Sequence, residues 1–331
     1  MARLIAGFAS SHGVMLTCTL EDWLRNFRKT DVRANFHDRR GSVVSYGELL
    51  AMAPANAAEL VSDEAITRRY QQVQADMARM RDEIASARLD VLIVCGDDQN
   101  ELFSKNLQPA LAIYHGADVL NGRKRDVAPG DWFRQAQNAR LEDVDGIRLP
   151  TDAELGTYLI HGLMDEFDVA ALAGTDPGKF IGHAYSFIHK TYLEANPVPM
   201  VPIFLNTHYE PNPINPKRCV ALGLALRRLI ENYPKDVRVG FLASGGLSHF
   251  QVEEDLDAVV IKATREKDLD TLSSLDVARL KAGSSEIRNW LVLAGVCGGL
   301  DLDWISYTPG YRTEALTGTG QAFATWYPPS A

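Results

Sequence analysis

Two histidines and one glutamate stand where they could hold a metal ion and move protons beside it. His12 follows an apolar segment that ends in Ser-Ser, His249 follows a Gly-Gly turn, and Glu286 precedes an apolar stretch. Neutral imidazoles and carboxylates from separate elements can bind one face of a divalent iron and leave the other open to substrate and oxygen. An unligated imidazole beside the ion can act as general acid/base, because its pKa of roughly 6.5 suits proton transfer near neutral pH. We expect His12 and Glu286 to be ligands and His249 to be the acid/base.

Strand ends are expected to present these side chains. The apolar segments 4–11, 91–96 and 237–242 each run into polar residues, and the middle one is followed by Asp-Asp-Gln99. In open α/β sheets, polar residues at the carboxyl ends of strands line a shared cleft. Three such ends therefore predict one common site.

Helical periodicity completes the expected fold. Apolar residues repeat at spacings of three and four from Ile66 to Ile84, which predicts a long helix that Ser62 can cap. The continuous apolar run 91–95 follows, as expected for a strand buried on both faces of a parallel sheet. We predict a single α/β domain over residues 1–331, with a mostly parallel central sheet flanked by helices.

Several segments depart from this regular pattern. We expect a covering excursion around 19–60 and a surface excursion around 121–150, which contains the basic cluster Arg123-Lys124-Arg125. Segment 198–206 is apolar but is interrupted by Pro199 and Pro202. The prolines predict an irregular strand or one near an edge of the sheet.

The segment around Glu286 has two interpretations. Gly-Ser-Ser-Glu286 is typical of a helix start with a hydroxyl cap, and a glutamate there can simply stabilise the helix end. The Gly-Gly-x-Ser-His249 turn could likewise be architectural. Convergence of these residues in space would favour a metal site over both architectural roles.

Composition excludes some classes of function. The chain has 331 residues, 46% of them hydrophobic, and a net charge of −9 with Lys and Arg scattered among acids, so nucleic acid is not an expected partner. Neither a membrane-spanning run nor a signal-peptide pattern is visible, and we expect a cytoplasmic protein. The four cysteines are far apart and are expected to be buried small hydrophobes.

Five motifs in chain order resemble those of one family. They are Ser-Ser-His12-Gly-Val, Gly-Asp-Asp-Gln99-Asn-Glu-Leu-Phe, Gly-His183-Ala-Tyr, Ala-Ser-Gly-Gly-Leu-Ser-His249 and Gly-Ser-Ser-Glu286-Ile-Arg-Asn-Trp-Leu. Together they are similar to the class III extradiol ring-cleaving dioxygenases, which include the protocatechuate 4,5-dioxygenase catalytic subunit and the gallate and 3-O-methylgallate dioxygenases. The start of the chain looks most like the 3-O-methylgallate branch.

The resemblance implies a cofactor and roles for residues. It implies Fe(II) held by His12, Glu286 and a third residue, with His249 as acid/base and His183 near the substrate oxygens. Gln99 occupies the place of the second ligand histidine of the family. Because an amide oxygen is a weaker donor than imidazole, His37, Asp98 and Glu101 are also candidates for this third position.

The same resemblance implies a substrate and a reaction. The substrate would be a catecholic aromatic acid (gallate, 3-O-methylgallate or protocatechuate-like), opened by O2 next to its diol. Tyr311 and Arg312, in the Gly-rich tail, are predicted to recognise its carboxylate, and self-association as a homodimer is expected by analogy. Two competing hypotheses are a metal-dependent hydrolase on the same fold and a non-catalytic binding homologue.

Overall fold

Four parallel strands form the centre of the main sheet in the computed structural model. They are β1 (Arg3–Ser10), β10 (Arg238–Ser244), β4 (Val91–Asp97) and β9 (Met200–Leu205), side by side in that order. Every residue of β4 and of β9 is buried. Continuous apolar segments of this kind suit strands that are covered on both faces.

Antiparallel strands extend the sheet on both sides of this centre. On one side, β13 (Thr317–Tyr327) pairs antiparallel with β1, with β11 (His249–Gln251) and with β12 (Asp301–Tyr311). On the other side, β5 (Leu111–Tyr114) runs antiparallel to β9 and parallel to β8 (Ala170–Leu172). Two separate antiparallel pairs are formed by β2 (Asn35–His37) with β3 (Val43–Ser45) and by β6 (Asp118–Asn121) with β7 (Ile147–Pro150).

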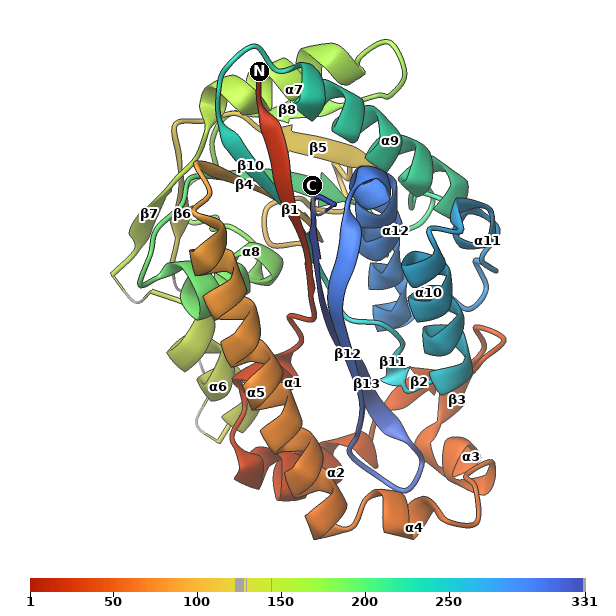
Figure 1. The fold of residues 1–331 in the computed structure, drawn as a ribbon. Helices are drawn as coiled ribbons and strands as arrows, with labels where there is room; N and C mark the ends of the chain where they lie inside the picture. Colours follow the sequence, from red (N-terminus) through yellow and green to blue (C-terminus); the bar gives the residue numbers. More distant parts are fainter. Residues whose placement is uncertain (123–127, 129, 144, 330–331) are drawn as a thin grey trace.

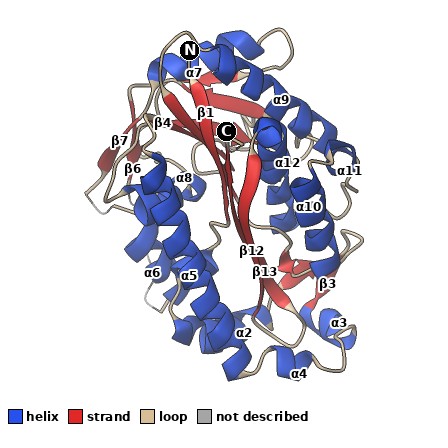
Figure 2. Cartoon of the chain, in the orientation of Figure 1, coloured by secondary structure: helices blue, strands red, loops and turns tan. Residues whose placement is uncertain are grey.

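Helices cover both faces of the sheet, as Figures 1 and 2 show. The long helix α5 (Asp63–Ala87) and the short helix α8 (His183–Ile188) lie against one face, and α9 (Pro216–Asn232) and α12 (Ile287–Val296) lie against the other. Each face has its own core of buried apolar side chains. The predicted capping of α5 is confirmed, since the Ser62 hydroxyl accepts from the Ala65 amide. The predicted α/β class is confirmed as well.

The structure describes residues 1–122, 128, 130–143 and 145–329, so the basic cluster Arg123-Lys124-Arg125 lies outside the described residues. Across the described ranges, no helix combines the length and the apolar character needed to cross a membrane. The four cysteines are buried and free, as predicted. The remaining α-helices of the described residues are α1 (Val14–Thr17), α2 (Phe27–Asp31), α3 (Tyr46–Ala51), α4 (Ala57–Leu60), α6 (Trp132–Leu141), α7 (Ala153–Leu163), α10 (Glu254–Glu266) and α11 (Leu269–Ser273).

Two local predictions were wrong. The proline-containing segment is not near an edge, because β9 is paired on both sides, with β4 and with β5. Pro202 is tolerated because the pairing with β5 ends at Ile203, so that ladder needs no amide hydrogen from the proline. The expected hydroxyl cap of α12 is also absent: a 3₁₀ turn (Ala282–Glu286) leads into the helix, and no side chain caps it.

Candidate metal centre

The carboxyl ends of β1, β10 and β4 meet at one edge of the sheet. Ser10, the last residue of β1, is opposite Ser244, the last residue of β10, and β4 is paired with β10 on its other side. His12 follows β1 by two residues, and Asp97 is the last residue of β4. Parallel pairing in this register therefore places polar side chains from distant parts of the sequence at the same place.

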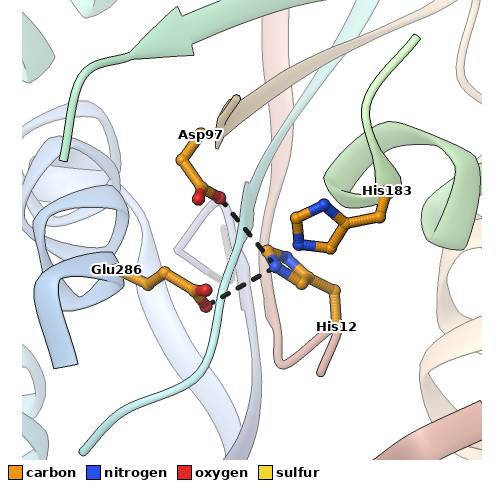
Figure 3. A group of neighbouring side chains, drawn as sticks. All are labelled: His12, Asp97, His183 and Glu286. Carbon is orange, nitrogen blue, oxygen red and sulfur yellow. Dashed lines mark ion pairs between the residues drawn. The ribbon is translucent and has the colours of Figure 1, made fainter. Parts of the chain in front are cut away.

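Four side chains converge there, as Figure 3 shows. His12, Asp97, His183 and Glu286 each offer a ligand atom, and these atoms all lie within 4.8 Å of one another. Nε2 of His12 is 3.5 Å from Oε2 of Glu286 and 3.9 Å from Oδ1 of Asp97. Two imidazoles and two carboxylates at this spacing form a donor set suited to a divalent transition metal.

The hydrogen bonds of His12 fix which ring nitrogen faces the centre. Nδ1 of His12 lies 2.9 Å from the hydroxyl of Ser244. That hydroxyl donates its hydrogen to the carbonyl of Ala184, so it must accept from Nδ1. Nε2 therefore carries the free lone pair, as a metal ligand requires.

Two buried atoms of the centre have no hydrogen-bond partner among the described residues. They are Nε2 of His12 and Oδ1 of Asp97. Buried polar atoms are normally satisfied, so two unsatisfied atoms that face each other indicate that a cation belongs between them. The residues present thus fit a divalent metal ion.

The charges of the two carboxylates respond differently to this environment. Burial raises the pKa of Asp97, and the nearby Glu286 raises it further. Burial also acts to raise the pKa of Glu286, but His12 and His249 outweigh it and hold that pKa well below its ordinary value. Of the two carboxyl groups of the centre, Glu286 therefore has the lower pKa.

The start of α12 positions Glu286 against the turn that follows β10. Oε2 of Glu286 accepts from the amide of Gly246 at 3.0 Å. Asn289 and Trp290 donate to the carbonyls of Ser244 and Gly245, at 2.8 and 3.0 Å. The glycine turn and the helix start are thereby locked together, and the predicted polar turn is part of the site.

His249 stands beside the four residues and contacts Glu286 from the other side. Its Nε2 is 3.3 Å from Oε1 of Glu286, and its Nδ1 is 2.8 Å from the carbonyl of Leu247. Ser284, one of the two serines of the segment in which a hydroxyl cap was expected, bonds both the amide and the carbonyl of His249. Burial acts to lower the pKa of His249, but Glu286 offsets this, so the pKa is raised above 6.5.

Glu101 fixes His183 at the start of α8. One carboxylate oxygen of Glu101 lies 2.9 Å from Nδ1 of His183 and accepts the His183 backbone amide at 2.7 Å. Glu101 was a candidate for the third ligand, and its carboxylate is directed at His183. The family resemblance implied a place for His183 near the substrate oxygens. The structure adds that its ring joins the group around His12.

Gln99 and Asp98, two further candidates for the third ligand, lie in the loop after β4. Nε2 of Gln99 donates to Oδ2 of Asp97 at 3.1 Å. Asp98 accepts the backbone amides of Glu101, Leu102 and Phe103, and burial raises its pKa to about 6. Asp97 reaches the centre instead, and its position at the end of a buried strand was the available signal.

The remaining predicted residues lie elsewhere. His37 is in β2 and lines a cavity with His208 and Phe250. The hydroxyl of Tyr311 bonds Glu254, and Nε of Arg312 is 2.9 Å from Oδ2 of the buried Asp31. Substrate recognition by Tyr311 and Arg312 stays a prediction.

Fold and site together define an α/β protein with a candidate metal centre at the carboxyl ends of its central strands. The chain belongs to the family described as the catalytic LigB subunit of aromatic ring-opening dioxygenase, which matches residues 150–323. This confirms the family resemblance seen in the sequence. The matched region includes His183, His249 and Glu286.

Two individual proteins are also similar to the chain. A gallate dioxygenase from Pseudomonas putida is 37% identical over 101 residues, which cover 29% of this chain and 28% of that protein. The crystal structure of uncharacterized protein JW3007 from Escherichia coli K12 aligns over 97% of this chain and 99% of that one, with 12% identity and a TM-score of 0.42.

Proposed function

We propose that the protein is a non-haem Fe(II)-dependent extradiol dioxygenase that opens the ring of a catecholic aromatic acid next to its diol. The observation that carries the proposal is the position of Glu286 between two imidazoles, with His12 on one oxygen and His249 on the other. Family membership supports a ring-opening dioxygenase, and the partial similarity to a gallate dioxygenase supports a gallate-like substrate.

His12 and Glu286 would hold the iron, through Nε2 and the carboxylate. An iron(II) ion held there would supply a redox centre at which a catechol and dioxygen can react. In the overall reaction, the bond between one carbon of the diol and the adjacent ring carbon outside the diol breaks. Both atoms of O2 enter the product. The ring supplies all the electrons, so no external reductant is needed.

His249 would move the protons of this reaction. Its Nδ1 is committed to the carbonyl of Leu247, so the exchangeable site is Nε2, which faces Glu286. Nε2 would take a proton from a substrate hydroxyl and return it as the ring opens. The Glu286 carboxylate raises the pKa of His249 above 6.5, which favours proton uptake by the imidazole.

His183 would orient the substrate. Its side chain is more exposed than that of His12, and Glu101 holds its Nδ1. The ring therefore faces the centre in a fixed orientation, from which it would hydrogen-bond a substrate oxygen.

Oxygen uptake tests the proposal. Protein loaded with Fe(II) under anaerobic conditions is mixed with gallate, 3-O-methylgallate or protocatechuate and then with oxygen. We expect uptake of one O2 per substrate and a ring-opened acid as product. His249→Gln should lower turnover by about 10²–10⁴-fold, whereas the matched change His161→Gln, at an exposed position of α7, should not. Absence of uptake with every catechol contradicts the proposal, and zinc-dependent turnover without oxygen demand would indicate a hydrolase.

A further inference from the structure

The side chain of Gln99 forms a hydrogen bond with a carboxylate of the metal centre. Nε2 of Gln99 donates to Oδ2 of Asp97 at 3.1 Å. A carboxylate only accepts, so the amide nitrogen of Gln99 must face Asp97. An amide nitrogen is not a metal ligand, so through this atom Gln99 binds the Asp97 carboxylate and not an ion.

Asp97 has one oxygen in use and one without a partner. Oδ2 accepts from Gln99, whereas Oδ1 is buried with no hydrogen-bond partner among the described residues. Oδ1 faces Nε2 of His12, the second unsatisfied atom of the centre, at 3.9 Å. A ligand carboxylate whose second oxygen is held by a neighbouring donor has this arrangement.

Three of the four side chains of the centre are more deeply buried than the fourth. The side chains of His12, Asp97 and Glu286 are 1%, 2% and 4% exposed, whereas that of His183 is 14% exposed. His183 is thus the one with access from outside, and Asp97 and Glu286 are two carboxylates close to the same imidazole nitrogen. Two buried carboxylates at this spacing need a cation to offset their repulsion.

We propose that Asp97 is the third protein ligand of the metal and that Gln99 is its positioning residue. The centre then has one imidazole and two carboxylates, and Asp97 takes the ligand place that the family resemblance gave to position 99. The inference rests on the proposed function only in requiring a divalent metal at this centre. Because Gln99 fixes Oδ2, Oδ1 stays directed at the ion.

Cobalt(II) titration tests this assignment without turnover. The visible absorption of bound Co(II) reports both affinity and ligand set. Asp97→Asn should weaken binding by more than about 100-fold and change the spectrum of whatever Co(II) still binds. Gln99→Ala should weaken binding by about 10–100-fold and leave the band positions unchanged, because the ligands stay the same. Gln71→Ala, at an exposed position of α5, is the matched control and should change neither.

The outcomes separate this inference from the proposed function. A spectrum that changes in Gln99→Ala while Asp97→Asn binds Co(II) normally would make Gln99 the ligand and overturn the assignment. Normal binding in both variants would also overturn it. If wild-type protein binds Co(II) but the Fe(II)-loaded protein consumes no oxygen with any catechol, the proposed function fails, while the ligand assignment is still decided by the spectra. Circular dichroism of the metal-free variants checks that each one folds.

Discussion

The imidazole of His249 lies directly against the α-carbon of Gly283. A β-carbon at position 283 would overlap Cδ2 and Nε2 of the His249 ring, so only glycine leaves room for it. Gly283 belongs to the 3₁₀ turn that also presents Glu286. One short turn therefore both supplies a proposed ligand and shapes the place of the proposed acid/base.

Gly283→Ala should consequently impair proton transfer. The added methyl group displaces the His249 ring, and we expect turnover to fall by at least about 10²-fold, the usual contribution of a positioned general acid/base. Oxygen uptake by the Fe(II)-loaded protein measures this. Gly174→Ala is the control, because a β-carbon there meets nothing within 4 Å. Full activity of Gly283→Ala would show that His249 is not the acid/base.

Ser244 should control metal affinity through His12. Its hydroxyl accepts from Nδ1 of His12, which leaves Nε2 free for the ion. Ser244→Ala removes this acceptor, and we expect metal affinity to fall by about 10–100-fold. Ser10→Ala is the matched control, since Ser10 is the register partner of Ser244 but bonds Tyr192 instead. Equal affinities of the two variants, measured by Co(II) titration, would refute this role.

Arg312 should contribute mainly to stability. Its guanidinium pairs with Asp31 at 2.9 Å, both side chains are 7% exposed, and the ring of Phe27 lies 4.6 Å from it. Arg312→Met leaves the Asp31 carboxylate buried without its cation, which should cost about 3–5 kcal/mol of unfolding free energy. Urea unfolding measures the loss. A raised KM with unchanged stability would instead support recognition of the substrate carboxylate by Arg312.

Asp257 should make stability depend on pH. Burial raises its pKa to about 6, although Tyr307 and Ser248 donate hydrogen bonds to it. The folded state therefore holds the proton more tightly than the unfolded state, and this contribution to stability is lost as pH rises from about 4 through 6. Between pH 4 and 7.5, wild type should lose on the order of 3 kcal/mol relative to Asp257→Asn. Urea unfolding curves that shift in parallel for both proteins would contradict this.

Local patterns predicted much of the fold. The helix after Ser62 and the buried strand 91–95 could be predicted because periodicity and capping act within a few residues. The convergence of His12, His249 and Glu286 was expected from strand ends and from the family resemblance, and the structure brings the three together.

Long-range packing determined what the sequence did not reveal. The entry of His183 into the group depends on α8 packing against β10, where Ser244 bonds the carbonyl of Ala184. The direction of the Asp97 side chain is not encoded in a polar alternation, because every residue of β4 is buried; its place at the end of the strand was the one signal. The partner of Arg312, Asp31, lies at the other end of the chain.

Labelled dioxygen tests the central claim most directly. Fe(II)-loaded protein is given gallate or 3-O-methylgallate under ¹⁸O₂, and the product is analysed by mass spectrometry. A dioxygenase places both labelled atoms in the ring-opened acid, and no unlabelled oxygen atom from water enters the initial product. A product that carries oxygen from water alone, or an intact ring after full metal loading, would contradict ring opening by dioxygen at this centre.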